Sequence, residues 1–271
     1  MARVGLGVTF PAHYRPTPGG GVGVIVLAID TATEMVSVAI VDGDELLAAS
    51  ESASNRRHAE DLTPMIEFVV QRAGLSFTDL AAVAVNVGPG LFTGMRVGIA
   101  AAQALAHVVA VPLVGIDGLE ALVAATKGAV GDHELIAPTV DARRREVAWA
   151  LHRVRDDGTT VRVGEPCVGT LEDLLLAVRD RAQSTLFVGD YALTHKERIL
   201  SELGPQAWSV SFGATLTAHP HAKHVAALAH ARLLREEVAA ESLTDGSAPS
   251  VPALYLREAD AEINWPTRSA S

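Results

Sequence analysis

The segment IDTATEMVSVAIV, residues 29–41, contains the pattern that decides the fold. An apolar run ends at Asp30, a short polar turn follows, and a second apolar run begins at Val36, six residues later. The segment VDARRREVAWALH, residues 140–152, repeats this order, and its apolar residues resume six positions after Asp141. Each segment is typical of two strands joined by a short turn.

The surrounding sequence extends this repeat. Residues 80–88, an apolar run that ends in glycine, have a counterpart at residues 185–189. Because the matches occur in the same order, they favour a duplicated α/β unit. We therefore predict a flexible, dispensable leader at 1–23, an N-terminal lobe at 24–118, a smaller, degenerate C-terminal lobe at 119–218, a closing helix at 219–241, and a linker and tail at 242–271.

Composition excludes several classes of function. The formal net charge of -10 does not attract a nucleic-acid backbone by bulk electrostatics. Hydrophobic residues make up 49% of the chain but aromatic residues only 4%, so the core is built from Ala, Val and Leu. Cys167 is the only cysteine, which excludes a disulfide within the chain and suits a reducing cytosol. The N-terminus is a poor signal peptide, and polar residues interrupt the apolar stretch 97–116, which predicts a buried helix and a strand and no membrane span.

A glycine loop, NVGPGLFTGMRVG at residues 86–98, follows the strand predicted at 80–85. Gly88 and Gly90 permit a close approach of the backbone to an anion, and Asp30 at a strand end could face the same cleft. No Lys-Ser/Thr pair follows, so the loop is not a P-loop. The alternative is a tight turn that packs helix against sheet, with Asp30 capping its own turn. We favour the turn and leave nucleotide contacts open.

The helix predicted at residues 93–109 points to a partner. Arg96, Gln103 and His107 share one narrow face with Ala100, and nearly every other position is small and apolar. A partner helix from another subunit would explain this excess of apolar surface, and a central core helix is the alternative.

A second helix is predicted at residues 58–73, where Pro64 predicts a late start or a bend. At its beginning His58, Glu60 and Asp61 do not share a helix face well, so a polar helix start is favoured over a metal site. The segment HPHAKH, residues 219–224, carries a lysine that would repel a metal cation.

Four segments together resemble the TsaB (YeaZ) family: VIVLAIDTATEMVSVAIVD, RRHAEDLTPMIE, VAVNVGPGLFTGMRVGIAAAQALAHVVAVPLVGIDGLEAL and VDARRREVAWA. The resemblance covers roughly residues 24–257 and is strongest up to Leu122. It implies the duplicated RNase H-like fold of the actin/Hsp70/sugar-kinase superfamily, with two lobes. It also implies a role in making N6-threonylcarbamoyladenosine at position 37 of tRNAs that read codons starting with A.

The family resemblance implies that a related subunit of this pathway, TsaD, transfers the threonylcarbamoyl group. It also implies that the ATPase TsaE joins the complex. Laying the segments side by side puts Gly118 and Leu122 where TsaD has two metal-binding histidines, and Lys223 where it has a ligand aspartate. None of these side chains suits a metal cation. The chain is therefore expected to be non-catalytic and to act as a scaffold for TsaD.

We accordingly predict no catalytic or metal-ligating residue and no cofactor bound by the isolated chain, with a nucleotide at the complex interface left open. Expected partners are TsaD and TsaE, and the chain alone is expected to form a homodimer. We expect tRNA to be contacted indirectly. The expected location is the cytoplasm. The predicted partner interface comprises His58, Leu62, Met65, Phe92, Thr93, Arg96, Ala100, Gln103 and His107. Competing hypotheses are an ATP-dependent kinase or ATPase that uses Asp30 and the loop at Gly88–Gly90, and a metallopeptidase.

Overall fold

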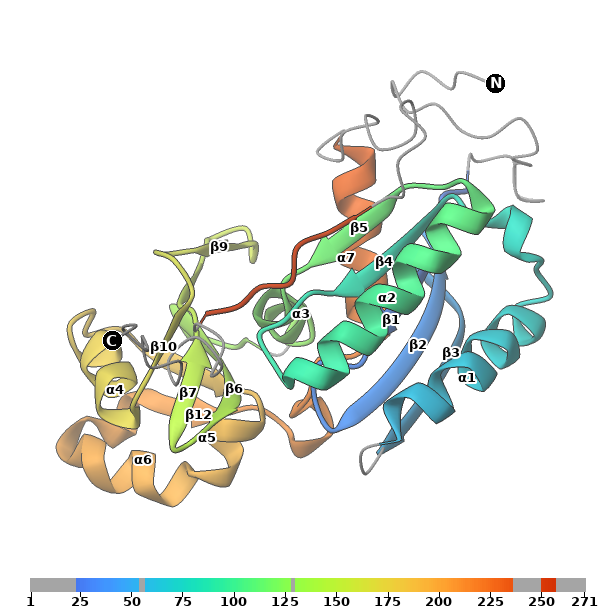
Figure 1. Ribbon diagram of the computed structural model, residues 1–271. Coiled ribbons are helices and arrows are strands. Elements are labelled where there is room, and N and C mark those ends of the chain that lie inside the picture. Colours follow the sequence, from blue (N-terminus) through green and yellow to red (C-terminus); the bar gives the residue numbers. More distant parts are fainter. Residues whose placement is uncertain (1–22, 54–56, 128–129, 236–249, 257–271) are drawn as a thin grey trace, which may run out of the picture.

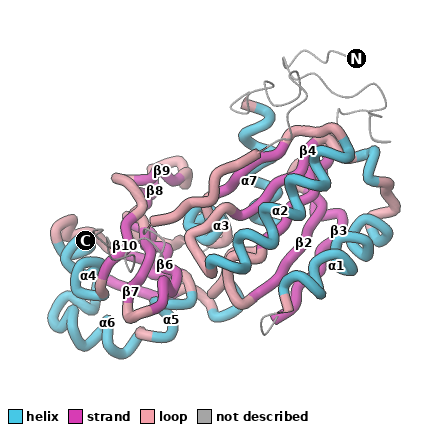
Figure 2. The backbone as a smooth tube through the Cα atoms, viewed as in Figure 1, coloured by secondary structure: helices cyan, strands magenta, loops and turns pink. Residues whose placement is uncertain are grey.

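The computed structural model describes residues 23–53, 57–127, 130–235 and 250–256, which form two α/β lobes (Figure 1). The predicted leader, except for its last residue, and most of the predicted linker and tail lie outside these residues. Figure 2 shows the helices of both lobes lying outside the strands.

The N-terminal lobe is built on one mixed sheet with the order β3-β2-β1-β4-β5. Strand β1 pairs antiparallel with β2 and parallel with β4, which in turn pairs parallel with β5. The strands are β1 (Ile25–Asp30), β2 (Met35–Asp42), β3 (Glu45–Ala53), β4 (Ala82–Asn86) and β5 (Leu113–Ile116), and the short helix η1 (Phe77–Asp79) precedes β4.

Helices cover both faces of this sheet, which explains why every residue of β1 is buried. Leu27 and Ile29 pack under α1 (His58–Arg72) and α2 (Phe92–Val109), whereas Val26 and Ala28 pack under α7 (Ala222–Leu234). The alternation of side chains along β1 thus divides its apolar run between two layers of helix.

The C-terminal lobe repeats the arrangement strand for strand. Its central path has the order β10-β7-β6-β11-β12, and β6 pairs antiparallel with β7 and parallel with β11. The predicted duplication is therefore confirmed, with a small β8–β9 hairpin added beside β6. The strands are β6 (Leu135–Arg143), β7 (Glu146–Trp149), β8 (His152–Val154), β9 (Thr160–Arg162), β10 (Cys167–Gly169), β11 (Thr185–Val188) and β12 (Val210–Phe212).

Shorter helices cover the second sheet. α4 (Leu171–Arg179) and α6 (Lys196–Leu203) pack on one face, and α3 (Gly118–Ala124), which follows β5, packs on the other. The remaining elements are α5 (Asp190–Thr194), η2 (Gly204–Ser209) and η3 (Thr215–Thr217), and η3 leads into α7.

Helix α1 corrects one prediction. It begins at His58, so the late start expected from Pro64 is wrong. Arg57 contacts Glu60 at 3.1 Å and Asp61 at 3.7 Å, and these two carboxylates in the first turn interact favourably with the helix N-terminus. Pro64 lies inside the helix, where it removes one backbone donor and its ring crowds the carbonyl of Glu60, so the bend stays a prediction.

Candidate functional site

Asp30 is part of a buried hydrogen-bond chain that shapes the glycine loop. Its Oδ1 accepts from the Ala32 backbone N–H at 2.9 Å, and its Oδ2 accepts from Asn86 Nδ2 at 2.8 Å. Asn86 Oδ1 in turn accepts from the Gly88 N–H at 2.8 Å. Burial raises the pKa of Asp30 to about 6, although these hydrogen bonds oppose the shift. Asp30 is 1% exposed, so its carboxylate supports the turn and does not face a cleft.

The glycines of the loop seat α2 against the turn between β1 and β2. A Cβ on Gly90 would lie 2.0 Å from the Ala32 carbonyl oxygen, and one on Gly94 would lie 2.2 Å from that of Thr31. A Cβ on Gly98, one helical turn further on, would lie 2.3 Å from Thr31 Oγ1. This geometry agrees with the packing interpretation of the loop, because Gly90 already contacts the β1–β2 turn.

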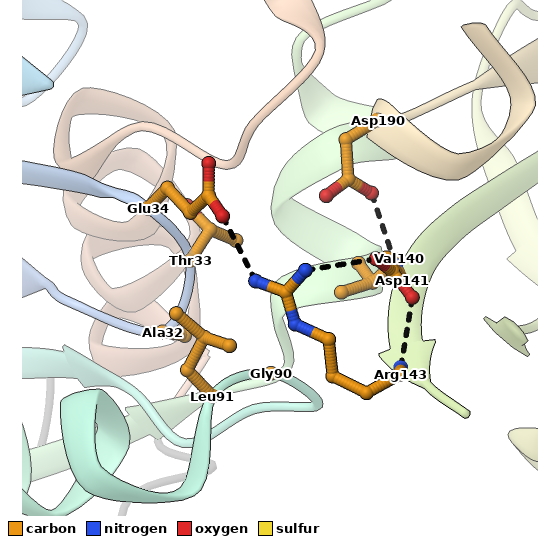
Figure 3. Close-up of a pocket in the computed structure, with 9 residues that line it drawn as sticks. All are labelled: Ala32, Thr33, Glu34, Gly90, Leu91, Val140, Asp141, Arg143 and Asp190. Carbon is orange, nitrogen blue, oxygen red and sulfur yellow. Dashed lines mark hydrogen bonds and ion pairs between the residues drawn. The ribbon is translucent and has the colours of Figure 1, made fainter. Parts of the chain in front are cut away.

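The cleft between the lobes is closed by an arginine (Figure 3). Arg143 Nη2 lies 2.9 Å from Glu34 Oε1 of the opposite lobe, and Nη1 lies 3.2 Å from Asp141 Oδ2. The Asp141 N–H donates to Asp190 Oδ1 at 3.0 Å, and burial raises the pKa of Asp190. About 10 Å³ remains here, which is room for one water molecule. Small-molecule sites are typically larger than 300 Å³, so the space at Arg143 does not itself hold a nucleotide. A second cavity of about 420 Å³ shares Asp190 with this space and is lined by Lys196 and Phe212 among others, so volume alone leaves the kinase or ATPase hypothesis open.

Gly118 and Leu122, the two positions that the family resemblance places opposite metal-binding histidines, have structural roles in this chain. A Cβ on Gly118 would lie 2.8 Å from Asn86 Nδ2, so a histidine does not fit without displacing the Asn86 amide. Leu122 is fully buried in the core beneath α3, and Lys223 is exposed. These residues do not fit a metal, and no group of three potential metal ligands occurs among the residues that the structure describes.

Two of the histidines that were considered as metal ligands, His58 and His221, have hydrogen-bond partners. His58 Nε2 lies 2.8 Å from the Thr33 carbonyl oxygen. His221 lies between Glu51 Oε1 at 2.8 Å and the Leu216 carbonyl oxygen at 3.0 Å. Burial, followed by the charge of Lys223, lowers the pKa of His224 to about 4.

The nine residues predicted to meet a partner divide into two groups. Phe92, Thr93, Arg96, Ala100 and His107 are exposed along α2, and Gln103 is half-buried. His58, Leu62 and Met65 are buried, which corrects their assignment as accessible contacts: they lie on the face of α1 that packs on the sheet. On α1 the large exposed apolar side chain is that of Phe68, which is 50% exposed.

Two further residues of this face were not predicted. Val108, near the end of α2, is 81% exposed, and Tyr255 joins the face from the C-terminal segment. Val108 has the helical spacing of an exposed position, which is a signal in the sequence. No signal in the sequence indicates Tyr255, because it is 159 positions away from Arg96, its hydrogen-bond partner.

Helix α2 is also long and apolar enough to cross a membrane, on length and composition alone. A single helix of this kind is weak evidence for a membrane span, since core helices of globular lobes meet the same criteria. Met95, Ile99, Ala102 and Ala106 of α2 belong to the core of the N-terminal lobe, so the helix is a component of that lobe.

Comparisons with known proteins agree with this fold. The chain is 41% identical to an uncharacterized Mycobacterium leprae protein over 154 residues, which span 55% of this chain but only 40% of that relative. It is 28% identical to the tRNA threonylcarbamoyladenosine biosynthesis protein TsaB of Bacillus subtilis, over 89% of this chain and 97% of that protein.

Among solved structures, a Pseudomonas aeruginosa protein described as similar to peptidase YEAZ is 27% identical, with a TM-score of 0.68, over 86% of this chain and 99% of that chain. The model of the family described as TsaD, tRNA N6-adenosine threonylcarbamoyltransferase, matches residues 50–265. The chain therefore belongs to that family, and within it to the TsaB/YeaZ group.

Proposed function

We propose that this chain is a non-catalytic subunit of the bacterial complex that makes N6-threonylcarbamoyladenosine at position 37 of tRNAs reading ANN codons. In this proposal it works in the cytoplasm, where it binds and stabilises the catalytic TsaD subunit, and TsaE joins them. The name of the B. subtilis relative supports the pathway, and the loss of side chains suited to a metal at Gly118 and Leu122 supports the non-catalytic role.

The observation that carries the partner hypothesis is the exposed face of α2. Small side chains at Ala100 and Ala104 lie on it, between the large apolar side chains of Phe92 and Val108. Small residues in the middle of a helix face allow a second helix to approach closely, and the larger residues at the ends add apolar contact. The same face is proposed to hold the homodimer when TsaD is absent, so TsaD and a second copy would compete for it.

Reconstitution of the modification reaction tests this function. Purified TsaD, TsaE and the adenylate-forming enzyme from the same organism are incubated with tRNA, with and without this chain, and modified adenosine is quantified. The proposal predicts modification that depends on this chain. It also predicts that the isolated chain does not bind ATP, which separates it from the kinase or ATPase hypothesis.

A metal assay separates the proposed function from the metallopeptidase hypothesis. Elemental analysis of the purified chain is expected to find no stoichiometric metal, whereas a metallopeptidase would require one.

A further inference from the structure

The segment 250–256, called the C-terminal strap below, crosses from one lobe to the other. The Leu254 N–H donates to the carbonyl oxygen of Val87, at the start of the glycine loop, at 2.7 Å. Val251 and Ala253 pack against the core of the N-terminal lobe, whereas Leu256 packs against the core beneath α3. Figure 1 shows the strap in red, running alongside β5 toward the C-terminal lobe. The strap is therefore fixed to the body of the protein.

Near its end the strap places Tyr255 over the first turn of α2. The ring centroid of Tyr255 lies 5.5 Å from that of Phe92, and its Oη accepts from Arg96 Nε at 3.2 Å. The Arg96 guanidinium carbon lies 3.8 Å from the Phe92 ring centroid, as in a cation–π contact. These three side chains form a surface cluster, called the aromatic cluster below.

The aromatic cluster has the composition of a binding hot spot. Phe92 is 44% exposed and Tyr255 is 47% exposed, although both are large aromatic residues. Tyrosine and arginine are enriched among the residues that dominate binding energy at protein interfaces. Phe92 and Arg96 also belong to the α2 face proposed above to meet a second subunit.

Holding Arg96 in place lowers the cost of binding. A free arginine side chain loses rotamer freedom when an interface forms, whereas Phe92 and Tyr255 already restrict this one. The Nη atoms of Arg96 make no hydrogen bond to the residues that the structure describes, so they are the donors presented outward. A planar pair of donors fits a carboxylate.

We propose that Tyr255 is a positioning residue of the partner face and that it holds Arg96 for contact with a carboxylate on a helix of TsaD. The proposal rests on the function proposed above. A helix laid along α2 would run from the aromatic cluster toward His107, an exposed residue near the other end of this 18-residue helix. The strap thereby makes the C-terminal part of this chain a component of the interface.

Binding measurements on full-length variants test the proposal. The dissociation constant for purified TsaD is measured by calorimetry for the wild-type chain, Tyr255→Ala, Tyr255→Phe and Leu176→Ala. Leu176, 56% exposed on α4 of the other lobe, is the matched control and is expected to leave the constant within about two-fold. Tyr255→Ala is expected to weaken binding roughly five- to thirty-fold. Tyr255→Phe, which loses only the hydroxyl acceptor, is expected to weaken it roughly two- to five-fold.

A double-mutant cycle with Arg96→Ala separates positioning from simple contact. If Tyr255 acts through Arg96, Tyr255→Ala costs clearly less affinity in the Arg96→Ala background than in the wild type. Thermal unfolding of each variant checks the fold, and Tyr255→Phe keeps the test valid if Tyr255→Ala is unstable.

Two outcomes overturn the proposal, and they are distinguishable. Unchanged affinity in both Tyr255 variants, with binding abolished by Ala100→Arg, refutes the role of the strap and leaves the proposed function standing. No binding of TsaD by the wild-type chain refutes both.

Discussion

Gly94 of α2 faces the carbonyl oxygen of Thr31 so closely that a Cβ at position 94 would lie 2.2 Å from that oxygen. The two residues also share a hydrogen bond, because Thr31 Oγ1 donates to the Gly94 carbonyl oxygen at 2.7 Å. This contact joins the glycine loop to the turn that follows β1.

Gly94→Ala therefore tests this contact through the sign of the change in the free energy of unfolding. Helix propensity alone would make alanine more stable than glycine by about 1 kcal/mol. We expect the opposite, a loss of roughly 1–3 kcal/mol in the free energy of unfolding, because the backbone of Thr31 must move. Urea denaturation measures the difference, and a stabilised variant would show that the close approach is not a constraint.

Asp30→Asn tests the buried carboxylate through its pH dependence. The pKa of Asp30 rises from 3.8 to about 6 on folding, so between these values the folded chain binds more protons than the unfolded chain. Stability due to this group therefore falls as pH rises through that window, by roughly 3 kcal/mol in total.

The stability of the wild type relative to Asp30→Asn should accordingly decline from about pH 4 to pH 6 and level off above it. Asp117, whose pKa burial also raises to about 6, is present in both chains and cancels in the difference. Denaturation at a series of pH values provides the measurement, and a difference that is constant with pH would contradict the assignment.

Arg143→Ala tests the ion pair that closes the cleft. The Arg143 and Glu34 side chains are 54% and 66% exposed, so the pair is screened by solvent and should contribute less than about 1 kcal/mol. The loss should shrink in 1 M salt. Arg198→Ala is the control, because the ion pair of Arg198 with Glu202 lies within the single helix α6. A loss of several kcal/mol would mean that Arg143 has a larger role than a surface pair.

Ala100→Arg tests the α2 face directly. Ala100 is exposed, so the variant should fold, with a free energy of unfolding within about 0.5 kcal/mol of the wild type. An arginine there adds bulk and charge where a second helix is proposed to pack, and binding of TsaD should weaken at least about 100-fold. Leu176→Arg places the same charge on α4 and should bind normally. Calorimetry and analytical ultracentrifugation give the affinity and the homodimer content, and unchanged values would refute the assignment.

The strand pattern around Asp30 and Asp141 predicted the duplicated fold because side-chain alternation and turn residues are local signals. The α2 face was predictable for the same reason, since Arg96, Ala100 and His107 follow the helical period. Local patterns could not show which face of α1 packs on the sheet, so His58, Leu62 and Met65 were assigned to a partner although the chain buries them itself.

Contacts between segments that are distant in the chain could not be predicted from the sequence. Tyr255 meets Arg96 across 159 positions and Arg143 meets Glu34 across 109. Such pairs depend on how the lobes and the strap pack, which no periodicity encodes.

The chain is proposed to support tRNA modification by binding TsaD through α2. The most direct measurement is the yield of N6-threonylcarbamoyladenosine in the reconstituted system with no added chain, the wild-type chain, Ala100→Arg or Leu176→Arg. Full yield is expected with the wild type and Leu176→Arg, and background yield with Ala100→Arg or no chain. Full yield without this chain, or with Ala100→Arg, would contradict this proposal.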